Sequence, residues 1–331
     1  MAAKRMYQTA GRTVRRMGRM MLFGAFLLLA TGLGVLGAVV YPHLWMTRPH
    51  AQLHEKGETG YVPASAQPMQ IEVSAPQAFV YDVEADEILW QKGSEYVVYP
   101  ASITKLWSIV TAMQYLNASD VITIGDEVAL IDEDSSVAYV SEGQKLTVEM
   151  LVEGMLLPSG NDAAYALAAA VGRVLLPQER DPQALVDAFV AEMNRYAQEC
   201  GLCGTTFTTP DGLAGQEHYT TIEDMVLIGR MALRQPLIAK YAATAEDSVV
   251  YESGESITWT NTNRLLRPDS IYYREGVVGL KTGSLAHNYC VTIAYQSGGK
   301  TYLAGVLGAW DGDRRFEDAC TIVDAIAAMN P

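Results

Sequence analysis

The chain has 331 residues, enough for one sizeable domain or two smaller ones around a large buried core. It is 49% hydrophobic and carries a formal net charge of −14 at pH 7. Because this acidic balance implies no basic surface on the bulk of the chain, we expect no nucleic-acid partner.

The N-terminal end departs from this acidic balance. Residues 1–19 contain several basic side chains and no acidic one, and residues 20–40 then run without a single charge. At about 1.5 Å per residue, this apolar run is long enough to cross a hydrocarbon core of roughly 30 Å. We therefore expect a basic cytoplasmic segment over residues 1–19 and a transmembrane anchor over residues 20–41, with the rest of the chain outside the cell membrane.

A cleaved signal peptide is the alternative interpretation of the same segment. Its apolar region is usually shorter and is followed by a small-x-small cleavage site. Leu36 fits poorly at the −3 position before Ala38, and Gly32 and Gly34 supply only a weak candidate site. An uncleaved anchor is therefore favoured, with a cleaved and secreted form as the alternative.

A linker and one folded domain follow the apolar run. Residues 42–69 are largely Pro, Gly and polar residues without periodicity, which is typical of a stalk. Residues 70–331 predict one α+β domain, because strands are expected near both of its ends and helices between them. The terminal strands are expected to share one antiparallel sheet that helices flank.

The first expected elements of this domain come in quick succession. Two strands are expected around the acidic turn at residues 84–86. A helix follows Pro100 and ends near Asn117, and apolar residues line one of its faces: Leu106, Ile109, Val110, Met113 and Leu116. A second helix over residues 147–157 is followed by a Pro-Ser-Gly-Asn turn.

Helices are expected to fill the middle of the domain, and strands to return near its end. An alanine-rich helix follows the turn and suits a close approach of backbones. Asp181, Pro182 and Gly201 delimit the next helix, and a capping-box spacing begins another at Thr221. Residues 288–310 then predict a strand, a glycine turn and a strand, and a C-terminal helix closes the chain.

Four cysteines are present: Cys200, Cys203, Cys290 and Cys320. The first two have C-x-x-C spacing, but there is no second such pair and no histidine cluster. We therefore expect no metal site, and favour small buried residues or one disulfide that export would permit.

The stretch "YPASITKLW" places Ser102 three residues before Lys105 near the start of a helix. At this spacing the two side chains lie on one face. A serine hydroxyl needs a base to become a nucleophile, and a buried lysine can hold a neutral amine that serves as one. The helix start also supplies unpaired N–H groups that can stabilise an oxyanion.

Histidine is an unfavourable candidate for this base. The chain has five histidines, of which three lie in or beside the stalk, and it has no G-x-S-x-G elbow. We expect His218 to order a turn. Taken alone, however, Ser-x-x-Lys is a weak signal, because a capping serine and an exposed lysine give the same pattern.

Two further motifs add weight to this pair. Ser159 and Asn161 lie in the turn between helices, where a hydroxyl and an amide can face a cleft. The segment "GLKTGS" places Lys281, Thr282 and Gly283 at the expected start of a strand. The first two can bind a carboxylate, and the glycine lets a substrate lie close to the strand edge. S-x-x-K, S-x-N and K-T-G in this order are typical of penicillin-binding proteins and class A β-lactamases.

From about residue 75 to residue 310, the chain resembles the serine D-alanyl-D-alanine carboxypeptidases, which are low-molecular-mass penicillin-binding proteins. The resemblance rests on "PASITKL", "LLPSGNDAAYALA", "TTPDGL", "HYTTIEDM", "NTNRLL" and "GVVGLKTG". It implies a β-lactamase/DD-peptidase-like fold and no cofactor. It also implies removal of the terminal D-Ala from peptidoglycan stem peptides, and acylation by β-lactam antibiotics.

The resemblance also implies roles for individual residues. Ser102 would be the nucleophile and Lys105 its general base. Ser159 would pass protons to the leaving amine, and Asn161 would hold the substrate's backbone amide. Lys281 and Thr282 would bind the terminal D-Ala carboxylate, and Gly283 would belong to the same substrate-binding strand. The backbone N–H groups of Ser102 and Ser284 would form the oxyanion hole.

Several alternatives stay open at this point. A β-lactamase would need a positioned carboxylate for deacylation, and no glutamate between Asn161 and Lys281 stands in an E-x-x-L-N-like pattern. A D,D-endopeptidase performs the same reaction on cross-links. A non-catalytic wall-binding or β-lactam-sensing module would keep the fold and lose turnover. The segment from Ser284 to Cys290 departs from the family pattern and supports this last alternative.

Overall fold

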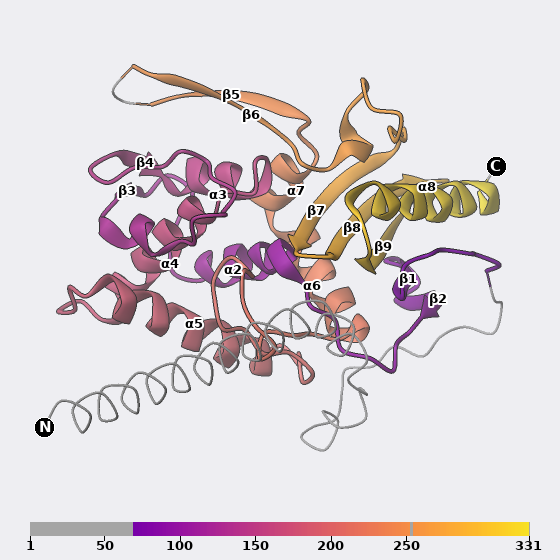
Figure 1. The fold of residues 1–331 in the computed structure, drawn as a ribbon, viewed down its shortest axis with the longest axis horizontal. Coiled ribbons are helices and arrows are strands. Elements are labelled where there is room, and N and C mark those ends of the chain that lie inside the picture. Colours follow the sequence, from indigo (N-terminus) through magenta and orange to yellow (C-terminus); the bar gives the residue numbers. More distant parts are fainter. Residues whose placement is uncertain (1–68, 252–253, 331) are drawn as a thin grey trace, which may run out of the picture. The chain divides into compact units, whose positions relative to one another are not determined.

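The structure is a computed structural model that describes residues 69–251 and 254–330 (Figure 1). These residues all belong to one compact unit, Arg48–Pro331. The expected basic segment, the anchor over residues 20–41 and nearly all of the stalk lie outside the described residues. Within the described residues, no helix combines the length and the apolar character needed to cross a membrane.

A five-stranded antiparallel sheet forms the centre of the domain. It consists of β1 (Gln77–Asp82), β2 (Glu87–Lys92), β7 (Val277–Leu285), β8 (Asn288–Ser297) and β9 (Lys300–Ala309). The order across the sheet is β2-β1-β9-β8-β7. Strands from the two ends of the domain thus share one sheet, which confirms the α+β prediction, and β7 is left at an edge.

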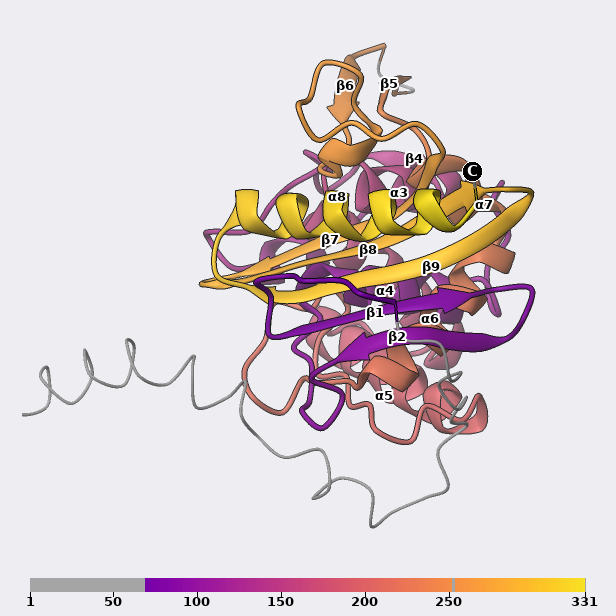
Figure 2. The same ribbon diagram turned by 90° about the vertical axis from the view of Figure 1, so that its right-hand side faces the viewer.

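The sheet separates two hydrophobic layers. The C-terminal helix α8 (Gly312–Met329) lies across one face (Figure 2), where Phe316, Ile322 and Val323 are buried. The remaining larger helices lie on the other face, around a core that includes Leu106 and Trp107. Because β8 and β9 are covered on both sides, most of their residues are buried.

Six helices make up the larger layer: α2 (Thr104–Ala112), α3 (Val148–Leu156), α4 (Asn161–Leu175), α5 (Pro182–Glu199), α6 (Ile222–Arg234) and α7 (Pro236–Ala242). Their ends follow the expected capping signals. The Asp181 side chain accepts from the Gln183 N–H, Thr221 accepts from the Asp224 N–H, and Gly201 follows α5 with φ +85°. The small residues of α4 allow the expected close approach, because a Cβ on Gly172 would lie 2.3 Å from the Leu185 carbonyl oxygen of α5.

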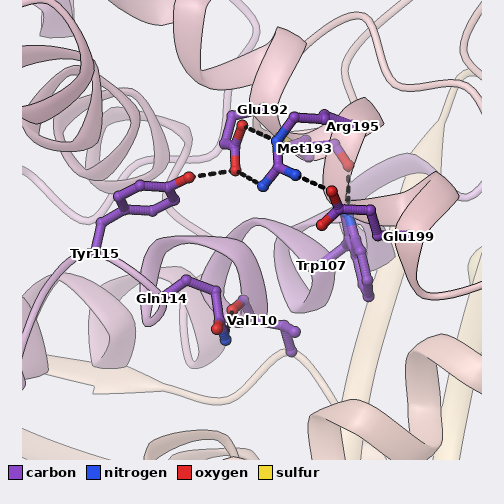
Figure 3. Close-up of polar contacts among 8 residues, drawn as sticks. All are labelled: Trp107, Val110, Gln114, Tyr115, Glu192, Met193, Arg195 and Glu199. Atoms are coloured by element: carbon purple, nitrogen blue, oxygen red, sulfur yellow. Dashed lines mark hydrogen bonds and ion pairs between the residues drawn. The ribbon is translucent and has the colours of Figure 1, made fainter.

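The helix α2 is fixed against α5 by polar as well as apolar contacts (Figure 3). All nine residues of α2 are buried. The Trp107 indole donates to the Met193 carbonyl oxygen at 3.0 Å, and the Tyr115 hydroxyl donates to Glu192. Arg195 holds Glu192 with an ion pair of 2.5 Å. These contacts fix α2, which carries Lys105.

Three details of the predicted elements were wrong. The helix α2 ends at Ala112 rather than near Asn117, and hydrogen-bonded turns continue to Leu116. Lys281 lies in the middle of a nine-residue strand rather than at its start. Two small two-stranded sheets were not predicted, β3 (Val121–Thr123) with β4 (Lys145–Thr147) and β5 (Glu246–Val250) with β6 (Ser256–Thr260). Three 3-10 turns complete the fold: η3 (Ala101–Ile103), η4 (Asp126–Leu130) and η5 (Arg264–Leu266).

The four cysteine thiols are free. Cys290 and Cys320 are buried, whereas Cys200 and Cys203 are half-buried. The structure thus agrees with small packed residues rather than with the disulfide alternative.

Candidate active site

Ser102 and Lys105 meet where η3 runs into α2. The chain enters through Pro100 and Ala101, and Ala101 has a left-handed φ of 47°. Ser102 is half-buried, whereas the Lys105 side chain is completely buried. The Lys105 Nζ donates to the Ser102 Oγ at 2.8 Å. The predicted serine–lysine pair is therefore formed, with the hydroxyl nearer the surface than the amine.

The Lys105 amine has two more polar partners. Its Nζ lies 2.7 Å from the Asn161 Oδ1 and 3.2 Å from the Asp211 carbonyl oxygen. Burial lowers the pKa of Lys105 to about 8, although the carboxylates of Asp211 and Asp162 partly counter this effect. With a pKa of about 8, roughly a tenth of the amine is neutral at pH 7, and this unprotonated fraction, which a general base requires, grows as the pH rises.

The turn with Ser159 and Asn161 begins α4 beside this pair. Ser159 is buried and has a φ of 66°, in the left-handed region that non-glycine residues rarely adopt. Its carbonyl oxygen accepts from the Ser136 hydroxyl at 2.8 Å, and the Asn161 amide donates to the Ser135 hydroxyl at 2.9 Å. The loop before β4 thus supports the turn, a contribution that the sequence analysis did not anticipate.

Asp162 holds the same loop, the one that precedes β4, by two hydrogen bonds. Its two carboxylate oxygens accept from the N–H groups of Ala138 and Val140, both at 2.8 Å. Two backbone donors therefore stabilise this buried carboxylate, and the loop cannot shift without breaking both bonds.

The edge strand β7 closes the other side of the site. A Cβ on Gly283 would lie 2.6 Å from the Pro100 carbonyl oxygen and 3.2 Å from the Ser102 nitrogen. Only glycine allows this close approach, which brings the backbone of Gly283 and Ser284 beside Ser102. The sequence predicts that Gly283 lets a substrate lie close to the strand, whereas the close neighbour in the structure is η3.

Two cations lie along β7. Lys281 is buried and donates to the Thr282 carbonyl oxygen at 3.1 Å, while the Thr282 hydroxyl lies 2.6 Å from the Thr262 hydroxyl. Arg315 of α8 donates to the Gly283 carbonyl oxygen at 2.9 Å and to the Ser284 hydroxyl at 3.0 Å. Neither Arg315 nor Thr262 was among the predicted site residues.

The two cations have no acidic partner. Neither Lys281 nor Arg315 forms an ion pair with any residue in the described ranges. Burial, together with the nearby charges of Lys105 and Arg315, lowers the pKa of Lys281 well below its usual value. Burial also lowers the pKa of Arg315 to about 10. An anion bound here would relieve this repulsion, so the strand favours a negatively charged group.

His218 is hydrogen-bonded to Thr104, the residue that precedes Lys105. Its Nδ1 accepts from the Thr208 N–H at 3.1 Å, so its Nε2 carries the proton and donates to the Thr104 hydroxyl at 2.8 Å. Burial lowers the pKa of His218 to about 3, which keeps the ring neutral. His218 thus orders the turn, as predicted. The turn at Asp211 and Gly212 is also tight, and it supplies the carbonyl that contacts Lys105.

Arg264, which lies in the "NTNRLL" motif, has structural partners. Arg264 pairs with Asp313 at 2.5 Å and lies over the ring of Tyr272. Within the described ranges, no group of His, Cys, Asp and Glu side chains is arranged to hold a metal ion.

The fold and this serine–lysine site together define a β-lactamase/DD-peptidase-like protein. The family model described as D-alanyl-D-alanine carboxypeptidase matches residues 63–310. The chain belongs to this family.

Curated relatives agree with this assignment. The chain is 29% identical over 255 residues to the D-alanyl-D-alanine carboxypeptidase DacF of Bacillus subtilis, covering 76% of the chain and 61% of the relative. It is 30% identical over 278 residues to the D-alanyl-D-alanine carboxypeptidase of Streptomyces sp. K15, covering 81% of the chain and 92% of the relative. The chain thus spans less than two thirds of the first of these relatives.

Solved structures show the same fold. The crystal structure of the Streptomyces K15 DD-transpeptidase superposes with a TM-score of 0.70 at 29% sequence identity, covering 78% of this chain and 99% of that one. A penicillin-binding protein homolog from Mycobacterium tuberculosis gives a TM-score of 0.67 at 25% identity, covering 82% of this chain.

Proposed function

We propose that the chain is a serine D,D-carboxypeptidase that removes the terminal D-Ala from peptidoglycan stem peptides. The observation that carries this proposal is the position of the Lys105 amine, 2.8 Å from the Ser102 hydroxyl and 2.7 Å from Asn161. A buried amine with a lowered pKa beside a serine hydroxyl is the arrangement that nucleophilic catalysis without histidine requires. Membership of the family supports the same reaction.

In the proposed acylation step, the Ser102 Oγ attacks the carbonyl carbon of the penultimate D-Ala and gives its proton to Lys105. The backbone N–H groups of Ser102 and Ser284 stabilise the resulting oxyanion. The C–N bond then breaks, and the departing D-Ala takes the proton through Ser159. The product of this step is an ester on Ser102, which water hydrolyses with Lys105 again as the base.

The terminal carboxylate of the substrate would lie along β7. Lys281 and Thr282 supply a buried cation and a hydroxyl there, and Arg315 supplies a second, half-buried cation next to Ser284. Because neither cation pairs with a described carboxylate, a substrate carboxylate is a favourable partner for both. Asn161 holds the backbone amide of the substrate. β-Lactams carry a similar carboxylate and carbonyl, so we expect them to acylate Ser102.

We also propose that residues 20–41 anchor the chain in the cell membrane, with the catalytic domain outside. The support is the length of the uncharged apolar run and the basic residues before it.

The proposed reaction is tested by D-Ala release. We expect a fragment of residues 70–331 to release D-Ala from a peptide ending in D-Ala-D-Ala. Replacing Ser102 by Ala should reduce this release by at least about 1,000-fold, because it removes the nucleophile. The variant should keep the circular dichroism spectrum of the parent.

Other outcomes distinguish the remaining functions. A folded fragment that binds penicillin but releases no D-Ala would favour the sensing module or an endopeptidase confined to cross-links. A fragment that neither releases D-Ala nor binds penicillin would contradict the assignment of Ser102.

A further inference from the structure

An exposed pair of aromatic rings lies at the end of the edge strand β7. His287 and Trp310 stack with ring centroids 4.6 Å apart and an angle of 10° between their planes. Trp310 is 51% exposed, whereas Trp107 and Trp259 are buried. We call these two side chains the aromatic platform.

The backbone holds both members of the platform in place. The strands β7 and β8 are joined by the two-residue turn Ala286–His287, and Ala286 has a left-handed φ of 49°. Trp310 follows the last residue of β9 and precedes Asp311, whose carboxylate accepts from two N–H groups at the start of α8. A stacked pair fixed in this way loses little conformational freedom when it binds a ligand.

The platform is close to the candidate active site. His287 lies four residues after Gly283, which packs against Ser102. Four residues of chain span at most about 14 Å. Arg315 further ties this part of the strand together, because it contacts both Gly283 and Ser284.

A peptide bound as in the proposed function would extend toward the platform, so this part of the inference rests on that function. With the carboxylate at Lys281 and the reacting carbonyl beside Ser284, the peptide runs antiparallel to the edge strand β7. The residues that precede the two D-alanines then continue past Ser284 to the Ala286–His287 turn. On this path, their side chains would reach the aromatic platform.

We propose that the aromatic platform is a binding subsite for the residue that precedes D-Ala-D-Ala, and that it selects a long aliphatic side chain such as that of lysine. The flat indole offers apolar surface to the methylene groups, and its face also attracts the ammonium group at their end. An alanine at the same place is too short to cover the rings.

The test compares acetyl-Lys-D-Ala-D-Ala with acetyl-Ala-D-Ala-D-Ala. We expect Trp310→Ala to lower the ratio of the two kcat/KM values, lysine over alanine, by about three- to tenfold. Trp310→Phe should retain most of the ratio, because it keeps an aromatic face. The matched control is Tyr273→Ala, which removes a 41% exposed aromatic side chain that precedes the opposite end of β7 and should leave the ratio unchanged.

Two results would overturn the subsite. An unchanged ratio in Trp310→Ala would show that the indole does not contact the side chain. Equal losses for both peptides would show a structural role instead.

A second readout does not depend on turnover. Binding of the same peptides is measured by calorimetry on Ser102→Ala, with and without Trp310→Ala. A wild-type chain that releases no D-Ala would contradict the proposed function alone. The subsite would still be supported by a preference for the lysine peptide that disappears with Trp310, and overturned by the absence of such a preference.

Discussion

Lys105 owes its chemical character to its surroundings rather than to its own covalent structure. Its amine is fully buried, and transferring an ammonium ion out of water disfavours the charged form. The nearest oxygens come from a hydroxyl, an amide and a backbone carbonyl, all of them uncharged. The pKa therefore falls far enough for a neutral amine to exist near neutral pH, while the hydrogen bonds keep it aimed at Ser102.

Replacing Gly283 tests whether β7 must approach Ser102 as closely as it does in the structure. In Gly283→Ala, the new methyl group would lie 2.6 Å from the Pro100 carbonyl oxygen, so β7 or η3 has to move. Overpacking of this kind costs about 1–3 kcal/mol, and the displaced oxyanion donors should slow acylation by β-lactam at least about tenfold.

The control for this variant is Gly215→Ala, since no atom lies within 4 Å of a Cβ built there. It should acylate at the parent rate. An acylation rate for Gly283→Ala within twofold of the parent would contradict the close-approach account.

The sequence predicts the site residues that belong to local motifs. The spacing of Ser102 and Lys105 was sufficient to place them together, since three residues on a helix bring side chains to one face. The sequence could not predict the contact between Lys105 and Asp211. This contact uses the backbone carbonyl of Asp211, and every residue has such a carbonyl. Arg315 was also missed, because it belongs to the last helix and reaches Ser284 only through tertiary packing.

Among the elements, those with strong end signals were predicted well. The helix α5 has a capping aspartate, a proline in its first turn and a glycine after its end, and all three act as expected. The hairpin of β5 and β6 has no such signal. Its strand β5 is mostly exposed and polar, so the alternation that marks a half-buried strand is absent.

The strand β7 shows how packing extends an element beyond its motif. Lys281 to Gly283 were placed at a strand start, but the strand begins at Val277 because β8 pairs with it from there. The longer strand gives the site a rigid edge. It also carries the chain directly from Lys281 and Thr282 to the aromatic platform.

For the whole molecule, the sheet brings the two ends of the domain together. The strands β1 and β9 are adjacent although more than 200 residues separate them in the sequence. The prediction that terminal strands share a sheet is therefore confirmed, but their order came only from the structure. The sequence patterns specify which segments are strands, whereas side-chain packing decides which strands become neighbours.

The membrane anchor is tested on the full chain. We expect the 331-residue protein to sediment with membranes and to resist extraction by high salt and alkali, because its apolar run would be embedded in hydrocarbon. Detergent should release it, and residues 70–331 alone should stay in the supernatant. A full-length chain that appears in the soluble fraction at its full mass would contradict the proposed anchor.

The most direct test of the central claim, a serine activated by a neutral lysine, is the pH dependence of acylation. The second-order rate of β-lactam acylation is measured between pH 6 and pH 10 on residues 70–331, with Ser102→Ala as the blank. Because only the unprotonated amine accepts the serine proton, and burial lowers the pKa of Lys105 to about 8, the rate should rise with pH and level off above an inflection near pH 8. A rate that is flat across this range, or that rises only near pH 10.5, would contradict the role given to Lys105.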